Sequence, residues 1–141
     1  DNLSLSVAPG TVRGLHYQVP PHAQGKLVSC LQGGILDVAV DLRVGSPTFG
    51  QSFQAELSAA NGRQMWVPEG FAHGFCTLEA NCLVSYKVTA FYNAECDAGL
   101  LWNDPALSIE WPAGQNEAVV SSKDKALPRF ANFQSPFFWQ G

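Results

Sequence analysis

The sequence predicts an all-β fold, a sandwich or barrel such as a jelly roll. Short runs of strand-forming residues follow one another at close, even spacing, several of them alternating between apolar and polar positions. Turn residues separate these runs, and the 141 residues include 13 glycines and nine prolines. Helical patterns are weak, as at residues 121–126. Many short strands joined by turns are typical of sandwiches and barrels, so we expect few, short helices.

The strand-type runs can be placed in order. Two β-rich runs, 27–32 and 35–42, flank Gly33-Gly34, and this pattern indicates a hairpin. The remaining runs have the same character, with glycine, proline or asparagine between them. The expected strands are 49–57, 64–67, 71–78 and 82–91, and the expected turns are 45–47, 60–62, 68–70 and 79–81.

A single domain is expected to span residues 1–141. The composition, 46% hydrophobic and 14% charged, is typical of an ordered globular chain. A net charge of −4 provides no basic footprint for nucleic acid, so an anionic ligand would need a local basic cluster. No apolar run has the length of a membrane span. No signal peptide is visible in a chain that starts at Asp1, which favours a cytoplasmic protein.

The four cysteines are expected to be buried, reduced thiols. None belongs to a Cys-x-x-Cys pair, so the ligand spacing of a zinc site is missing. Cys30 and Cys76 lie in apolar runs, where a free cysteine behaves as a small hydrophobic residue. A disulfide is the alternative, and nothing in the spacing supports it.

The run 13–18, Arg-Gly-Leu-His-Tyr-Gln, is the most informative feature of the chain. It contains His16, one of only three histidines, which should share a strand face with Val12 and Gly14. Carbon-acid chemistry beside a carbonyl requires a base and a nearby cation. His16 is the candidate base, and Lys26, on the next apolar run, is a candidate cation. The alternative is that His16 is a structural histidine of the core.

Further candidates lie later in the chain. His73 has small neighbours that leave room for a ligand, and its alternative role is to stabilise a turn. Tyr86 and Tyr92 alternate with Val84 and Val88 in an expected strand, where either tyrosine is a candidate acid. The alternative is that both are core aromatics with hydrogen-bonded hydroxyls.

Two acidic residues, Asp37 and Asp41, share a face of the most hydrophobic expected strand. Buried carboxylates are costly unless paired, so we expect partners such as Arg43 or backbone amides. The alternative is a strand face open to solvent. The aromatic tail, 130–139, is expected to pack on the barrel or across a dimer interface rather than to bind a ligand.

The sequence does not favour a metal site. Jelly rolls that hold a metal commonly use two histidines one residue apart and then a glutamate, whereas Tyr17-Gln18 follows His16 here. Convergence of His16, His22 and His73 in space is the alternative.

Several motifs, in order, resemble the dTDP-4-dehydrorhamnose 3,5-epimerase family, and the similarity extends from about residue 1 to about residue 124. They are Arg-Gly-Leu-His-Tyr-Gln at 13–18, Ala-Gln-Gly-Lys-Leu-Val at 23–28, Asp-Val-Ala-Val-Asp-Leu-Arg at 37–43, Gly-Ser-Pro-Thr-Phe-Gly at 45–50, Pro-Glu-Gly-Phe-Ala-His-Gly-Phe at 68–75, Tyr-Lys-Val-Thr at 86–89 and Trp-Asn-Asp-Pro-Ala-Leu at 102–107. The resemblance implies a cupin-type jelly roll, a homodimer, no metal and no cofactor. It also implies epimerisation at C3 and C5 of a dTDP-linked 4-keto-6-deoxyhexose in dTDP-L-rhamnose synthesis.

The resemblance also assigns roles to individual residues. His16 matches the family's base and Asp124 the aspartate that orients it. Lys26 matches the lysine beside the keto oxygen, and Tyr86 the tyrosine that returns a proton from the opposite face. Substrate-binding positions are matched by Arg13, which would bind the diphosphate, and by Asn2, Gln18, His73, Tyr92 and Asp97.

The chain departs from the family pattern in two places. Asp97 stands where the family usually has a glutamate, which is one methylene longer. Family members also carry a preceding segment that crosses to the partner subunit and helps to bind the nucleotide, and no such stretch precedes Asp1. We therefore expect residues 1–141 to retain the chemical residues and to bind the nucleotide less tightly.

Two alternative functions remain open on the sequence. One is a relative that epimerises a single carbon in natural-product biosynthesis, since the matched motifs are shared by both kinds of enzyme. The other is a cupin that binds a sugar nucleotide without turning it over.

Overall fold

The computed structural model describes residues 1–114 and 116–141. Its elements, in chain order, are β1 (Asn2–Ser6), β2 (Thr11–Gln18), β3 (Lys26–Gln32), β4 (Gly34–Asp41), β5 (Ser52–Ser58), β6 (Gln64–Val67), β7 (Phe71–Thr77), β8 (Cys82–Val88), β9 (Asp97–Gly99), η1 (Pro105–Leu107), β10 (Val119–Val120), α1 (Ser122–Lys125) and η2 (Phe130–Asn132).

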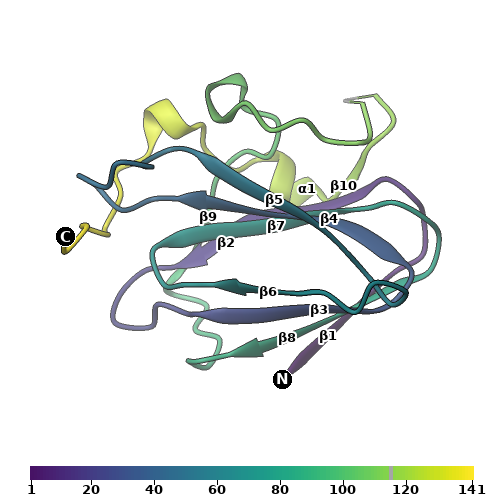
Figure 1. Cartoon of the computed structure of the whole chain (residues 1–141). Helices are drawn as coiled ribbons and strands as arrows, with labels where there is room; N and C mark the ends of the chain where they lie inside the picture. Colours follow the sequence, from purple (N-terminus) through teal and green to yellow (C-terminus); the bar gives the residue numbers. More distant parts are fainter. Residues whose placement is uncertain (115) are drawn as a thin grey trace.

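The strands form two sheets that face each other (Figure 1). Sheet A has the order β1-β8-β3-β6, and sheet B has the order β10-β2-β7-β4-β5 with β9 also paired to β2. Neighbouring strands are antiparallel except β10, which runs parallel to β2. The predicted all-β jelly-roll sandwich with few short helices is therefore confirmed.

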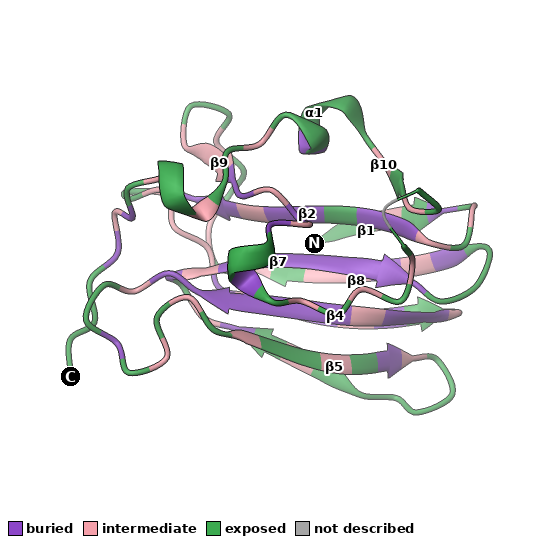
Figure 2. Ribbon diagram, turned by 90° about the horizontal axis from the view of Figure 1, so that it is seen from above, coloured by how far each residue is buried: buried purple, intermediate pink, exposed green. Residues whose placement is uncertain are grey.

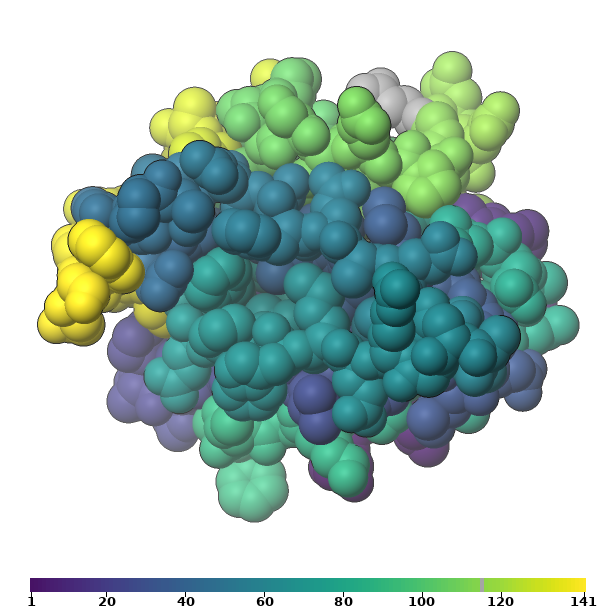
Figure 3. Space-filling view, in the orientation of Figure 1, coloured from purple at the N-terminus to yellow at the C-terminus, as the bar shows by residue number. Residues whose placement is uncertain are grey.

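Apolar side chains fill two layers, one on each face of sheet B. Between the sheets, Val28 and Val84 of sheet A pack with Phe75 and Leu57 of sheet B. The outer face of sheet B is covered by the segment that follows β9, seen in green and yellow in Figure 3. Viewed from that side, buried residues run along β2, β7 and β4, while the edge strand β5 has only one buried residue (Figure 2). Sheet B is thus the central layer of the molecule.

The hairpin expected around Gly33-Gly34 is wrong. β3 belongs to sheet A, whereas β4 pairs with β5 and β7 in sheet B. Gly33 has φ +81° and turns the chain from one sheet to the other. Since both strands carry apolar inner faces, they bury these faces against each other across the sandwich instead of pairing edge to edge.

The remaining strand predictions agree in place, and the run 64–67 also agrees in length. The run 49–57 begins as a strand only at Ser52, because the Asp41 backbone bonds with Gly50 and Gln51 in the preceding turn. The run 82–91 ends as a strand at Val88, so Tyr92 lies in a loop and not in the strand predicted for it. The strands β1, β9 and β10 were not predicted.

The two acidic residues of β4 are buried, and each has a side-chain partner. Asp41 accepts hydrogen bonds from Arg43 Nε at 2.9 Å, Ser46 Oγ at 2.6 Å and Thr48 Oγ1 at 2.5 Å. The partner predicted for both acids, Arg43, therefore serves Asp41 only, and Asp37 pairs with a residue described below. This network fixes the Gly-Ser-Pro-Thr turn that leads to β5.

Other expectations are also settled by the fold. All four cysteines are free thiols, and three of them are buried while Cys96 is partly exposed. The aromatic tail packs onto sheet B, where the Phe137 and Tyr17 rings meet edge to face at 5.9 Å. Within residues 1–114 and 116–141, no helix has the length and apolar character needed to cross a membrane.

Candidate active site

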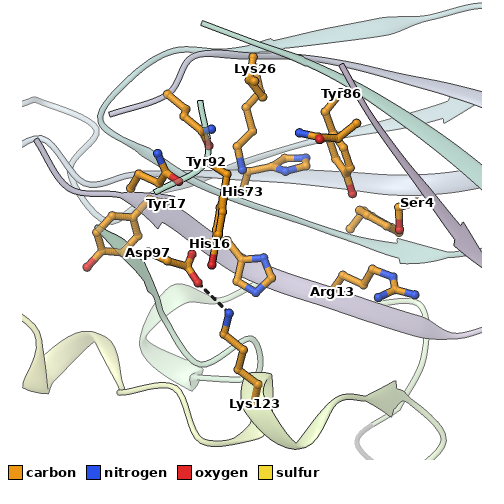
Figure 4. A pocket seen from close by; sticks show the side chains of 15 residues that line it. Ser4, Arg13, His16, Tyr17, Lys26, His73, Tyr86, Tyr92, Asp97 and Lys123 are labelled. Atoms are coloured by element: carbon orange, nitrogen blue, oxygen red, sulfur yellow. Dashed lines mark hydrogen bonds and ion pairs between the residues drawn. The ribbon is translucent and has the colours of Figure 1, made fainter. Parts of the chain in front are cut away.

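A cleft of about 280 Å³ lies between the two sheets. Sheet A supplies Lys26 and Tyr86 to its wall, and sheet B supplies His16 and His73 (Figure 4). All the residues predicted for the site line this cleft except Asp124, which contacts His16 from outside the lining. Residues that are far apart in the sequence thus meet because the two sheets face each other.

An extra residue in β2 turns the key side chains toward the cleft. Arg13 pairs with Phe75 and His16 with His73, so β2 uses one more residue than β7 over this stretch. Such a bulge reverses the alternation of side chains. Both Arg13 and His16 consequently line the cleft, while Val12 is buried in a separate apolar cluster. The prediction that Val12 and His16 share a face is wrong for this reason.

The bulge depends on Gly14. Its φ is +124°, which side chains other than glycine rarely adopt. A Cβ at this position would lie 2.7 Å from Gly74 Cα and 2.8 Å from the His73 carbonyl oxygen. Since both neighbours are backbone atoms, only glycine fits here.

His16 and Asp124 form a hydrogen-bonded pair. Asp124 Oδ1 lies 2.7 Å from His16 Nε2, and Oδ2 accepts a hydrogen bond from the Gly14 amide at 3.1 Å. Burial by itself would raise the pKa of Asp124, but the bonds from His16 and Gly14 hold it below its ordinary value. Among the described residues Nδ1 of His16 has no hydrogen-bond partner, so this nitrogen is free to accept a proton.

The segment that carries Asp124 is short and capped. Ser121 Oγ accepts a hydrogen bond from the Asp124 amide at 3.1 Å, as an N-cap residue does at the first turn of a helix. The helical pattern at 121–126 corresponds to α1. The cap fixes the backbone from which Asp124 reaches His16.

Lys26 and Tyr86 are neighbours on the inner face of sheet A. Tyr86 pairs with Val28 while Lys26 pairs with Val88, so the two side chains lie diagonally across β3 and β8. Burial lowers the pKa of Lys26, and the carboxylates of Asp37 and Asp97 oppose this. Burial and the charge of Asp37 raise the pKa of Tyr86, which keeps its hydroxyl protonated.

His73 is a buried residue of β7, not a turn residue. Its Nε2 lies 2.6 Å from Oδ1 of Asp37, and both side chains are almost inaccessible to solvent. The ring also meets the ring of Tyr86 at 5.8 Å in an edge-to-face arrangement. Asp37 thus finds its partner in His73, which the sequence did not suggest.

Arg13 and Asn2 border the cleft beside β1. Arg13 Nε donates to Ser6 Oγ at 3.0 Å, and Nη2 donates to the Leu5 carbonyl at 3.3 Å. These bonds hold the guanidinium beside β1. Asn2 stands opposite Tyr86 in the register of β1 and β8.

Gln18 lines the cleft, but its side chain is already bonded to the protein. Its amide nitrogen donates to the carbonyls of His22 and Phe91, and its oxygen accepts from the Asn93 amide. These bonds fix the position of the loop that carries Tyr92. The side chain of Tyr92 is exposed and lines the cleft. Gln18 is therefore better suited to hold this loop than to contact a ligand.

An ion pair joins Asp97 of β9 to Lys123 of α1 at 2.7 Å, shown by the dashed line in Figure 4. Sequence reasoning missed Lys123, although it precedes Asp124 directly. It also missed Ser4, Tyr17, Gln24, Phe75 and Val88, which line the same cleft. Alternation along β1 and β8 from Asn2 and Tyr86 would have indicated Ser4 and Val88.

The possible convergence of His16, His22 and His73 is not seen. His22 does not line the cleft. In the part of the chain that the structure describes, no three histidine, cysteine, aspartate or glutamate side chains are grouped as a metal would require.

Comparison with known proteins agrees with this site. The profile of the dTDP-4-dehydrorhamnose 3,5-epimerase family matches residues 1–132. The chain belongs to this family. The epimerase of this name from Sinorhizobium fredii is 57% identical over 137 residues, which are 97% of this chain and 70% of that protein. The resemblance drawn from the motifs is therefore confirmed, as is the class of activity, a carbohydrate epimerase.

Solved structures of the family have the same fold. An epimerase from Legionella pneumophila in complex with dTDP-4-keto-L-rhamnose superposes with a TM-score of 0.91 at 45% identity, covering 98% of this chain and 73% of that one. A 3'-monoepimerase from Streptomyces bikiniensis in complex with dTDP-quinovose gives a TM-score of 0.81 at 32% identity, covering 92% and 66%. Epimerases that differ in the number of carbons they invert thus share this architecture.

Proposed function

We propose that this chain epimerises C3 and C5 of dTDP-4-keto-6-deoxyglucose on the route to dTDP-L-rhamnose, with His16 as base and Tyr86 as acid. The observation that carries the proposal is the 2.7 Å bond between His16 and Asp124 at a cleft whose opposite wall holds Tyr86 and Lys26. The base and the acid then approach the sugar from opposing sheets. Inversion of a carbon requires such an arrangement, because the proton must leave one face of the carbon and return to the other.

The first step is removal of a proton from a carbon next to the C4 ketone. Asp124 accepts a hydrogen bond from Nε2–H of His16, which fixes the ring tautomer and leaves Nδ1 as the proton acceptor. The electron pair of the broken C–H bond moves onto the keto oxygen and gives an enolate. Lys26, which lines the cleft, supplies the positive charge that stabilises it, since a preorganised cation beside the developing charge acts strongly.

The second step returns a proton to the opposite face. The raised pKa of Tyr86 keeps the hydroxyl in its acid form at neutral pH. Its proton passes to the carbon as the enolate collapses to the ketone, and the configuration is inverted. His16 then loses its proton and the phenolate of Tyr86 regains one, so that no net proton is consumed.

Arg13 is suited to the diphosphate of the substrate. Its guanidinium borders the cleft beside β1, and a planar fork with several N–H groups suits phosphate oxygens. Asn2, His73 and Tyr92 contact the sugar nucleotide in this proposal, while Gln18 and Asp97 act by holding the loop and α1. The proposal includes no metal and no cofactor.

We further propose that the chain works as a homodimer. Alternate side chains of β1, β3 and β6 place Leu3, Leu5, Leu31 and Trp66 on the outer face of sheet A, and each is more than half exposed. Exposed large apolar side chains gathered on one face of a sheet are typical of an interface between subunits. Light scattering after size-exclusion chromatography tests this, and a monomer at micromolar concentration would contradict it.

The experiment that tests the reaction is incubation with dTDP-4-keto-6-deoxyglucose in deuterated water. The proposal expects deuterium at both C3 and C5 and a product with the L-rhamno configuration, as determined by NMR. An unlabelled, unchanged sugar nucleotide would support the non-catalytic binding protein instead.

A second candidate is an enzyme that inverts a single carbon. The structural similarity to the 3'-monoepimerase keeps it open, because the shared fold serves enzymes of both kinds. Deuterium and inversion at only one of the two carbons would establish this function in place of the first.

A further inference from the structure

The helix α1 carries Asp124, yet it consists of only four residues. A single helical turn is not stable by itself, so its position has to come from contacts with the rest of the molecule. Before it, β10 pairs with β2, and after it the Pro128 carbonyl accepts a hydrogen bond from the Leu101 amide. These backbone bonds fix the two ends of the segment. The orientation of the turn between them depends on the side chains that leave it.

Two consecutive side chains of α1 reach two neighbouring strands. Asp124 Oδ1 lies 2.7 Å from His16 Nε2 on β2. Lys123 Nζ donates to Asp97 Oδ2 on β9 at 2.7 Å, and Figure 4 shows this side chain extending from α1 beside the His16 ring. The two strands are paired, with Asp97 opposite Gln18. A turn held by one bond can rotate about it, whereas bonds to two strands fix its rotation as well.

The ion pair between Lys123 and Asp97 is exclusive and partly open to water. Neither residue has another ion-pair partner among the described residues, and the two side chains are 66% and 17% exposed. An ion pair with this exposure adds little to the stability of a whole fold, because water screens it. Its effect is therefore expected in the placement of α1 rather than in folding.

We infer that Lys123 is a positioning residue for the base, because its ion pair with Asp97 holds α1 in the orientation from which Asp124 fixes the His16 ring. The consequence for catalysis rests on the proposed function, in which His16 removes the proton. Lys123 touches no reacting atom in this role. Since its side chain also lines the cleft, direct contact with the substrate is the competing role that the experiments must exclude.

The bond between His16 and Asp124 can be followed without catalysis. A ring N–H proton held by a carboxylate gives a downfield proton NMR signal, and its exchange rate with water reports how often the bond opens. The signal of His16 is the one absent from His16→Ala, and the signal of the buried pair of His73 and Asp37 is the internal reference. Lys123→Met keeps the length of the side chain and removes its charge. Exchange at His16 should then be about fivefold faster, a size that an ion pair partly open to water can supply.

Matched variants show whether the effect belongs to the ion pair. Asp97→Asn should speed the exchange at His16 as Lys123→Met does, whereas Lys123→Arg, which keeps the charge, should retain the wild-type rate. Lys125→Met is the control, since Lys125 lies on the same turn, is exposed and has no ion pair among the described residues. A wild-type exchange rate in both Lys123→Met and Asp97→Asn overturns the inference, and so does an equal acceleration in Lys125→Met.

Catalysis provides the second readout. Lys123→Met and Asp97→Asn should each lower kcat by about fivefold, with KM for the sugar nucleotide nearly unchanged. The double variant should be no slower than either single variant, since both changes remove the same bond. A rise in KM with kcat retained, or additive effects of the two changes, would mean that Lys123 acts on the substrate directly and would overturn the inference. If the chain has no epimerase activity, the proton exchange still decides whether Lys123 and Asp97 hold the bond between His16 and Asp124, so failure of the inference and failure of the proposed function are separate outcomes.

Discussion

At the residue scale, the account depends on a base held in one orientation. His16 is fixed through Asp124, and its side chain is 35% exposed, so its removal should not disturb the core. We expect His16→Ala to lower kcat by at least about 10²–10⁴-fold, the usual contribution of a positioned base. Steady-state kinetics with circular dichroism checks this, and His22→Ala, outside the cleft, is the matched control. Turnover close to wild type in His16→Ala would move the base to another residue.

Asp124→Asn tests the orienting partner. Asparagine has nearly the same shape, but its amide nitrogen can turn toward Nε2 of His16 and favour the tautomer that protonates Nδ1. We therefore expect a large fall in kcat with little change in KM, since Asp124 does not line the cleft. An unchanged kcat would show that His16 needs no partner for its role.

At the element scale, the bulge in β2 is the feature that builds the site. We expect Gly14→Ala to lower both stability and activity, because the new Cβ would meet backbone atoms of β7 at 2.7 and 2.8 Å. Gly114→Ala is the control, since nothing lies within 4 Å of a Cβ there. Thermal unfolding and kcat measure the two effects. A Gly14→Ala protein as stable and as active as Gly114→Ala would mean that neither stability nor activity requires glycine at the bulge.

The connection between β4 and β5 predicts a dependence of stability on pH. Burial would raise the pKa of Asp41, but the bonds from Arg43, Ser46 and Thr48 lower it strongly. A carboxyl with a depressed pKa stabilises the fold above its unfolded pKa of about 3.9, and this stabilisation is lost as the pH falls through the folded value. Asp41→Asn should therefore cost about 3 kcal/mol at pH 7, as loss of one partner of a buried pair does.

The same difference should shrink as the pH falls below about 4, because Asp41 then takes up a proton in the unfolded chain, whereas in the folded protein its lowered pKa keeps it charged. Urea unfolding of both proteins at pH 7 and near pH 2 measures it. An equal difference at both pH values would contradict this account of the turn.

Elements also show what the sequence can and cannot predict. Strand runs and glycine turns are local patterns, so β3 to β8 could be placed within a few residues. Pairing is not local, and the Gly33-Gly34 turn looked like a hairpin although its strands belong to different sheets. The alternation of apolar and polar residues in the sequence does not indicate the bulge at Gly14. The partners of His16 and His73 are 108 and 36 residues distant in the sequence. Asp124 could therefore be suggested as the partner of His16 only by family resemblance, and Asp37 was not suggested as the partner of His73.

At the scale of the whole molecule, the segment after β9 completes the core. Its aromatic residues cover the outer face of sheet B, the sheet that carries His16 and His73. Phe137 is buried there and meets the ring of Tyr17, a residue of the cleft wall. We expect Phe137→Ala to destabilise the fold by about 3–5 kcal/mol, the usual cost of removing a buried phenylalanine.

Chemical denaturation measures this loss, and Phe138→Ala is the control because the neighbouring ring is 63% exposed. Equal stability of the two variants would mean that the tail does not belong to the core. A loss confined to Phe137→Ala would show that the covering segment is part of the core.

The central claim, that protons leave and arrive on opposite faces of the sugar, is tested most directly by Tyr86→Phe. Deuterium wash-in at C3 and C5 and the configuration of the product are measured by NMR on the same sample. The account predicts that exchange continues, because His16 and Lys26 remain, while inversion is largely suppressed. If exchange and inversion fell by the same factor in a well-folded Tyr86→Phe protein, Tyr86 would not be the separate acid, and Tyr92 would be the next residue to test.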